Sequence, residues 1–202
     1  MLQKLDFVPQ IFKGRQIMNI EINETNRTKK WIMDALLILL QKRTYHDITI
    51  AQIVEKAGLG RRTFYRYFKT KDDVMTGIAQ SLMDEFADTI LKNHAHNLET
   101  VTESYFEFWE ARIDILRLLK QAKLLHFIGD NMIPLISGVA AKVKHVPSSP
   151  VDDETLMQVY NQYKYDFTFK LAGFWQITIV WCEETPRKSP AEMSRIVMEI
   201  LK

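Results

Sequence analysis

Seven consecutive residues, Arg61 to Tyr67, carry three guanidinium groups and three hydroxyls. An arginine can donate two parallel hydrogen bonds to the edge of a guanine base, and Thr and Tyr hydroxyls donate to phosphate oxygens. The seventh side chain, Phe64, is apolar, as is Phe68 just beyond the segment. These residue types suit a surface that packs on protein on one side and meets phosphates and base edges on the other.

The donors fall into groups if the segment is a helix with Gly60 as its N-cap. At roughly 100° per residue, Phe64 and Phe68 share one face, and Arg62 and Arg66 lie nearly opposite them. The flanks of the outer face carry Thr63 with Tyr67 on one side, and Arg61 with Tyr65 on the other. We therefore expect the arginines to face base edges and the hydroxyls to lie beside the phosphate strands.

The residues before this helix predict the element that positions it. Thr49 and Gln52, three residues apart, form a capping box, and Gly58 suits the end of the same short helix. The buried side of this helix is expected to consist of Ile50, Ile53, Val54 and Ala57. Two short helices joined by a glycine-containing turn are typical of a helix-turn-helix, in which the second helix enters a DNA groove.

Helices on either side complete the expected domain. Apolar periodicity predicts one helix over residues 27–42 and a long one from Lys71 to Asn93. One face of the first of these carries Trp31, Ala35, Ile38 and Leu39. The Lys71 ammonium and the free N–H groups of its helix could hold one phosphate, and Thr49 could hold another. Three alternatives stay open: Thr49 is only a helix cap, the Tyr65 hydroxyl bonds to protein, or Arg61 is only solvated.

This part of the chain resembles the N-terminal domain of the TetR family of bacterial transcriptional regulators. The likeness covers about a quarter of the chain and is carried by the capped helix and by two runs, Thr63-Phe64-Tyr65-Arg66-Tyr67-Phe68 and Lys71-Asp72-Asp73-Val74. Gly60 departs from the pattern, because the family usually has a Ser cap there. The resemblance implies base contacts by Arg61, Arg62 and Arg66, and phosphate contacts by Thr63, Tyr65, Tyr67 and Lys71.

The composition of the whole chain is that of a globular helical protein. Its 202 residues are 47% hydrophobic and 26% charged, with 7 Gly and 6 Pro. We predict an all-α fold of about nine helices, the last beginning near Pro190 with Ser189 as its cap. No apolar run reaches the roughly 20 residues that cross a bilayer. The single cysteine, Cys182, suits a reducing cytoplasm, which is the expected location.

Charge is distributed unevenly along the chain. Residues 27–71 hold 11 Lys/Arg against 3 Asp/Glu, a net +8, whereas residues 72–202 hold 13 against 19, a net −6. Such an asymmetry would orient the molecule toward a polyanion. The predicted organisation is a loose N-terminal arm over 1–24, a helix-turn-helix domain over 25–71, and a helical regulatory and dimerisation domain over 72–202. Whether translation starts at Met1 or Met18 stays open.

Apolar stripes in the last two predicted helices, one over about residues 156–182 and the other from Pro190, indicate a homodimer. The TetR-like architecture implies a four-helix bundle between two subunits at this place. The candidate interface residues are Leu171, Phe174, Trp175, Thr178, Trp181, Met193, Ile196, Val197 and Ile200. The alternative is that these side chains form the internal core of a monomer.

The resemblance also implies a pocket for a small-molecule effector between the middle helices. The candidate lining residues, each of which could instead be core, are Phe106, Trp109, Leu125, His126, Phe127, Met132 and Phe167. No cofactor is predicted. His94 and His96 lack the Cys or carboxylate support expected of a metal site. No nucleophile–base pair or glycine-rich phosphate loop is visible, so an enzyme is not expected.

The predicted function is a repressor that binds a near-palindromic operator as a dimer and leaves it when an effector binds. The two second helices of the motif would then enter successive major grooves, roughly 34 Å apart. The alternatives are a transcriptional activator of the same fold, or a helical protein that binds DNA or a partner without sequence preference.

Overall fold

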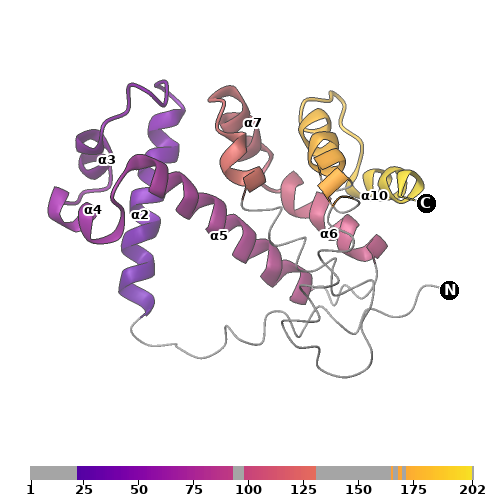
Figure 1. The fold of residues 1–202 in the computed structure, drawn as a ribbon, viewed down its shortest axis with the longest axis horizontal. Coiled ribbons are helices and arrows are strands. Elements are labelled where there is room, and N and C mark those ends of the chain that lie inside the picture. Colours follow the sequence, from indigo (N-terminus) through magenta and orange to yellow (C-terminus); the bar gives the residue numbers. More distant parts are fainter. Residues whose placement is uncertain (1–21, 93–97, 131–164, 166–167, 170–171, 202) are drawn as a thin grey trace.

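The computed structural model describes residues 22–92, 98–130, 165, 168–169 and 172–201, and within these the regular structure is helical, without strands. The named helices are α2 (Ile22–Leu40), α3 (Ile50–Lys56), α4 (Arg61–Tyr67), α5 (Lys71–Lys92), α6 (Leu98–Glu110), α7 (Ile113–Gln121) and α10 (Pro190–Ile200) (Figure 1). Residues 125–130 and 172–181 are also helical. The prediction of an all-α fold is confirmed. None of the described helices is both long and apolar enough to span a membrane.

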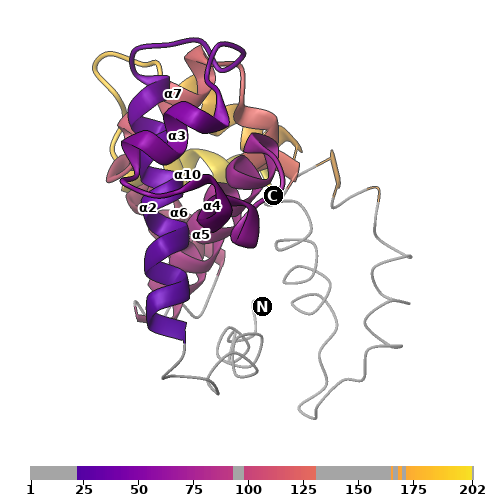
Figure 2. The same cartoon turned by 90° about the vertical axis from the view of Figure 1, so that its left-hand side faces the viewer.

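The first three described helices form a unit at one end of the molecule, seen face-on in Figure 2. α2 packs on α3 and α5, and α3 packs on α4. The shared core holds the buried side chains Ile32, Ala35, Leu36, Leu40, Ile48, Ile53, Val54, Phe64 and Phe68. Burial of these apolar surfaces is what holds the two short helices in place, since helices of seven residues are not stable alone.

The structure corrects the predicted limits and buried face of α2. The helix begins at Ile22 and ends at Leu40, where the sequence predicted residues 27–42. Ala35 is buried as expected, but Trp31 and Ile38 are exposed. The buried stripe lies one position away, on Ile32 and Leu36, because α3 and α5 both cover that side of the helix.

α5 links the unit of α2, α3 and α4, which we call the helix-turn-helix unit, to the rest of the chain (Figure 1). Its packing on the end of α4 is close, since a Cβ at Gly77 would lie 3.1 Å from Cε1 of Phe68. Farther along, Glu85 pairs with Arg112, whose Nη2 lies 2.9 Å from the Glu85 Oε2. α5 therefore contacts both the DNA-reading unit predicted from the sequence and the helices that follow it.

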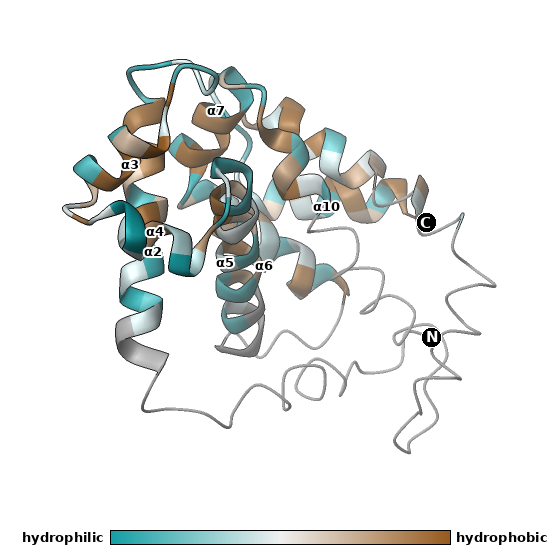
Figure 3. Cartoon of the chain, turned by 60° about the vertical axis from the view of Figure 1, so that its left-hand side comes forward, coloured by the Kyte–Doolittle hydropathy of each residue, from teal (hydrophilic) through white to brown (hydrophobic). Residues whose placement is uncertain are grey.

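The second part of the molecule is built on α6, which packs on α5, α7 and α10. Its core is aromatic: Tyr105 and Phe106 contact Phe174, and Phe106 also meets Trp181 with ring centroids 5.2 Å apart. The Ser194 hydroxyl of α10 donates to the carbonyl of Glu99 at 3.0 Å. The cap predicted for α10 is confirmed, since Ser189 and Glu192 form a capping box with Pro190 at the first turn. In Figure 3 hydrophilic residues predominate in α4, whereas α10 carries both hydrophobic and hydrophilic residues.

Candidate nucleic-acid interface

The turn between α3 and α4 has the backbone geometry that its two glycines allow. Gly58 adopts φ +67°, which L-residues with a side chain rarely adopt, and the amide of Leu59 donates to the Val54 carbonyl at 2.8 Å. Gly60 is the N-cap of α4, at φ −88° and ψ 155°, and makes no side-chain cap bond. The predicted helix, turn and second helix are therefore confirmed.

The faces of α4 lie as the helical spacing predicts. Phe64 and Phe68 are buried, and their ring centroids lie 6.1 Å apart. The outer side is solvent-accessible: Arg61, Arg62 and Arg66 are exposed, Thr63 and Tyr67 are half-buried, and Tyr65 is 57% exposed. A core position for Tyr65 is thus wrong. The Arg66 guanidinium lies over the Tyr67 ring, 4.9 Å from its centroid.

The N-terminus of α3 is exposed and capped by its own side chains. Thr49 Oγ1 accepts from the amide of Gln52 at 3.3 Å, and the Gln52 side chain accepts from the Thr49 amide at 2.9 Å. The capping box is confirmed. A phosphate contact of Thr49 stays a prediction.

Lys71 begins α5 as predicted, but its ammonium is already bonded to protein. It donates to the carbonyls of Tyr45 at 2.6 Å, His46 at 3.1 Å and Ile48 at 3.0 Å. The three hydrogen bonds use all three N–H groups of an ammonium. The phosphate contact predicted for Lys71 stays a prediction, and in this structure it would require one of these bonds to break.

No role was predicted from the sequence for the acidic residues that follow Lys71. The Tyr45 hydroxyl donates a short hydrogen bond to Asp72 Oδ1, and burial together with this carboxylate raises the pKa of Tyr45 above its usual value. Asp73 Oδ2 accepts from the amides of Lys69 and Thr70, which lowers the pKa of Asp73. A Thr70–Asp73 capping pattern was legible in the sequence and could have revealed the second of these roles.

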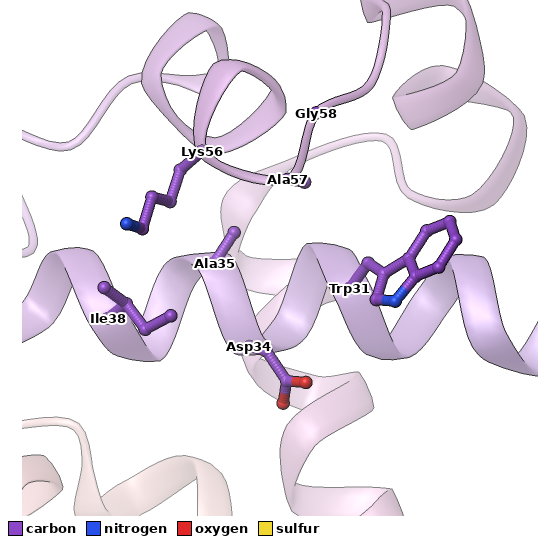
Figure 4. Close-up of a pocket in the computed structure, with 7 residues that line it drawn as sticks. All are labelled: Trp31, Asp34, Ala35, Ile38, Lys56, Ala57 and Gly58. Carbon is purple, nitrogen blue, oxygen red and sulfur yellow. The ribbon is translucent and has the colours of Figure 1, made fainter.

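A shallow open groove of about 400 Å³ lies on the outer side of α2, beside the end of α3 (Figure 4). It is lined by Trp31, Asp34, Ala35, Ile38, Lys56, Ala57 and Gly58. The Arg27 guanidinium lies over the Trp31 ring, 4.8 Å from its centroid. The groove belongs to the helix-turn-helix unit and is therefore not the effector pocket predicted between the middle helices.

The residues predicted to line that effector pocket differ widely in exposure. Phe106 and Trp109 are fully buried, Leu125 and Phe127 are half-buried, and His126 is exposed. Met132 and Phe167 lie outside the described residues. Phe106 and Trp109 pack among other aromatic rings, so both serve the core in this structure. The pocket stays a prediction.

Four residues predicted at the dimer interface are instead covered by their own chain. Thr178, Trp181, Met193 and Val197 are buried within the single subunit. α6 packs on α10, and its Tyr105 and Phe106 contact Thr178 and Trp181. Phe174, Trp175 and Ile196 are half-buried and Ile200 is exposed, whereas Leu171 lies outside the described residues. For those four positions the alternative of an internal core is the correct one.

Metal ligands are not assembled in the part of the chain that the structure describes, since it contains no group of three or more His, Cys, Asp or Glu side chains placed to hold an ion. His94 and His96 lie outside that part.

Comparison with known proteins identifies the family to which the chain belongs. Residues 32–77, which hold the last nine residues of α2, all of α3 and α4 and the start of α5, match the model of the bacterial regulatory proteins of the tetR family. The chain is a TetR-family transcriptional regulator. TetR-family proteins are DNA-binding transcription factors of the helix-turn-helix type and not enzymes.

Several relatives agree with this assignment. An uncharacterized HTH-type transcriptional regulator of Bacillus subtilis (strain 168), YxbF, is 25% identical over 180 residues, covering 84% of this chain and 43% of that protein. The dhaKLM operon transcriptional activator DhaS of Lactococcus lactis is 33% identical over 66 residues, 33% of this chain and 34% of that protein. The matches thus span less than half the length of these two relatives.

Solved structures support the fold of the TetR-family regulator over most of its length. A TetR transcriptional regulator from Streptococcus agalactiae 2603V superimposes with a TM-score of 0.60 at 16% identity, covering 96% of this chain and 99% of that one. The fatty acid degradation regulator FadR from Bacillus halodurans gives a TM-score of 0.58 at 17% identity, over 86% and 94% of the two chains.

Proposed function

We propose that this TetR-family regulator is a repressor that binds a near-palindromic operator as a homodimer and is released by a small-molecule effector. The observation that carries DNA recognition is the division of α4 into two sides. Buried Phe64 and Phe68 fix the helix on the protein, and the exposed guanidinium groups of Arg62 and Arg66 lie on the opposite side. An arginine so presented is suited to guanine edges in the major groove.

The same surface provides donors for the DNA backbone. Tyr65, Thr63 and Tyr67 flank the arginines, and Arg61 stands at the first turn of α4. We assign phosphate contacts to the hydroxyl groups and base contacts to the three arginines. The net charge of +8 over residues 27–71 favours approach to a polyanion. In this proposal residues 25–71 form the DNA-binding domain and residues 72–202 the regulatory domain.

An exposed apolar surface supports the dimer. Tyr165 is 80% exposed, Phe169 81%, Val180 54% and Ile200 64%. Gly173, which is also exposed, leaves room for a partner helix, since a Cβ there would meet nothing within 4 Å. Large apolar side chains this exposed are best explained by a second copy of the chain. The dimer would place two α4 helices on the two operator halves.

The effector would bind between the middle helices and change the separation of the two α4 helices. An activator of the same fold is the alternative, and one relative, DhaS, carries that name. Either regulator would act in the cytoplasm, where the operator is. Transcription from a promoter that carries the selected operator, measured with and without the protein, distinguishes repression from activation.

The test of sequence recognition uses the Arg62→Ala/Arg66→Ala double variant. Operator sites are first selected from random DNA with the wild-type protein. The double variant should then lose the preference for the selected site over unrelated DNA, while its dimerisation, measured by sedimentation, is retained. Lys42→Ala/Arg43→Ala is the matched control, because both side chains are exposed, lie outside α4 and carry the same charge. Gel shifts in which the α4 variant keeps its sequence preference would refute the assignment.

A further inference from the structure

The ammonium group of Lys71 lies in a cradle of backbone carbonyls at the start of α5. The carbonyls belong to residues 45, 46 and 48 in the turn that precedes α3, 23 to 26 residues earlier in the chain. The ammonium also lies over the Tyr45 ring, 4.5 Å from its centroid. A compact ammonium with three donors fits such a cradle, whereas the planar guanidinium of arginine would not.

A second bond joins the same two segments. The Tyr45 hydroxyl donates to the carboxylate of Asp72, the residue after Lys71. Tyr45 thus contacts α5 through its carbonyl, its ring and its hydroxyl. The turn before α3 and the first turn of α5 therefore form one unit, which we call the Lys71 junction.

The Lys71 junction lies directly before the N-terminus of α3. Ile48, whose carbonyl accepts from Lys71, is buried and precedes the N-cap Thr49. The direction of α3, and through the glycine turn that of α4, depends on where this turn is held. Because the Lys71 side chain is bonded to three carbonyls of the turn, it fixes the start of α3 relative to α5.

The surroundings of the ammonium do not favour a phosphate. Three carbonyl oxygens already surround it, and the Asp72 and Asp73 carboxylates stand in the same first turn of α5. The amide of Asp73 donates to the Thr70 hydroxyl at 3.0 Å, so this N–H of the helix terminus is also used. Phosphate binding would bring a further anion to a site whose donors are occupied.

We infer that Lys71 is a positioning residue for operator binding: it holds the α3 N-terminus against α5 and does not itself contact phosphate. The inference rests on the proposed DNA-binding function. A phosphate contact and a positioning role differ in how operator affinity depends on salt. A lysine that neutralises a phosphate releases a counterion, and its removal lowers the slope of log K against log salt by about 0.9. A lysine that only positions other groups leaves this slope unchanged when it is removed.

The experiment measures operator affinity against salt concentration for Lys71→Met and Lys71→Arg. Binding of the wild-type protein to the selected operator tests the proposed function. The role of Lys71 is tested separately, by the affinities and salt slopes of the variants on the DNA that the wild type binds. We expect both substitutions to weaken binding about tenfold, as for loss of hydrogen bonds to a charged group, with the slope unchanged. Lys69→Met, which removes an exposed charge two residues away, is the matched control.

Each other outcome overturns the inference. A fall of the slope by about 0.9 in Lys71→Met, with wild-type affinity in Lys71→Arg, would make Lys71 a phosphate contact. Unchanged affinity in both variants, even with a lower thermal midpoint, would leave Lys71 with a role in stability alone. Should Lys71→Met not fold, Lys71→Arg and Tyr45→Phe decide. Tyr45→Phe removes the bond to Asp72 without changing charge, so it must weaken operator binding at unchanged slope, and wild-type affinity would overturn the inference.

Discussion

Thr49 combines a cap that the structure shows with a phosphate contact that the sequence predicts, and three substitutions separate the two roles. Its hydroxyl accepts from the Gln52 amide, and its own amide donates to the Gln52 side chain. Thr49→Ala removes the hydroxyl and with it one half of the capping box. Thr49→Asp keeps a good cap but places a negative charge where the phosphate is expected. Thr49→Ser is the conservative control.

The expected magnitudes differ in stability and in binding. Loss of the cap in Thr49→Ala should cost about 1 kcal/mol of unfolding free energy, a fall of about 2–4 °C in thermal midpoint for a chain of this size. Thr49→Asp should change stability by less than about 0.5 kcal/mol. A carboxylate about 4 Å from a phosphate is repelled by about 1 kcal/mol in water and about 4 kcal/mol near a protein surface. Operator affinity in Thr49→Asp should therefore fall between about fivefold and roughly a thousandfold.

The assays are thermal unfolding followed by circular dichroism, at fixed protein concentration, and fluorescence anisotropy with the selected operator. Thr49→Ser should resemble the wild type in both. Wild-type operator affinity in Thr49→Asp would refute the phosphate contact, since a carboxylate cannot replace a phosphate donor without cost. A wild-type melting temperature in Thr49→Ala would refute the energetic role of the capping box.

Three further tests probe other parts of the structure. The buried Tyr105 hydroxyl donates to Thr178 Oγ1 at 3.0 Å, because the Thr178 proton is directed to the Phe174 carbonyl. Thr178→Val should therefore lower the free energy of unfolding in urea by about 1–3 kcal/mol, and the double variant with Tyr105→Phe should lose less than the sum of the two single losses. Additive losses would contradict a hydrogen bond between these two side chains. Gly58→Ser, at φ +67°, should cost about 1–2 kcal/mol. Gly60→Ser, at φ −88° with open space at its Cβ, should instead add a few tenths of a kcal/mol, and equal effects of the two substitutions in thermal melts would disprove the backbone argument. Burial raises the pKa of Tyr105, so its contribution to the free energy of unfolding should be fully present below about pH 10 and be lost as the pH rises further. The free energy of unfolding should therefore fall less steeply above about pH 10 in Tyr105→Phe, and identical pH profiles for the two proteins would exclude this cause.

Much of the DNA-binding domain could be predicted because its determinants are local. The Thr49 cap, the left-handed Gly58 and the N-cap Gly60 each act over three or four residues, so their patterns are legible in the sequence. The same holds for Ser189 at the start of α10. The start of α2 was missed, because residues 22–26 show no apolar period that would extend the helix to Ile22.

Contacts between distant segments could not be predicted in this way. The sequence places Lys71 at a helix start, but its partners lie in a turn more than 20 residues earlier. The apolar stripe with Thr178 and Trp181 is equally consistent with a dimer interface and with an internal core. Both residues are buried against α6, so they belong to the internal core.

By itself, then, the sequence determined which donors α4 carries and which of its faces they share, because the helical period fixes the direction of each side chain around the axis. Only the tertiary structure decided which faces of the other helices are covered by protein and which are exposed. It turned Trp181 inward, left Val180 exposed and enclosed the Lys71 ammonium among carbonyls. The period specifies which residues lie together on a helix, whereas the covering of a face depends on how helices far apart in the chain pack on one another.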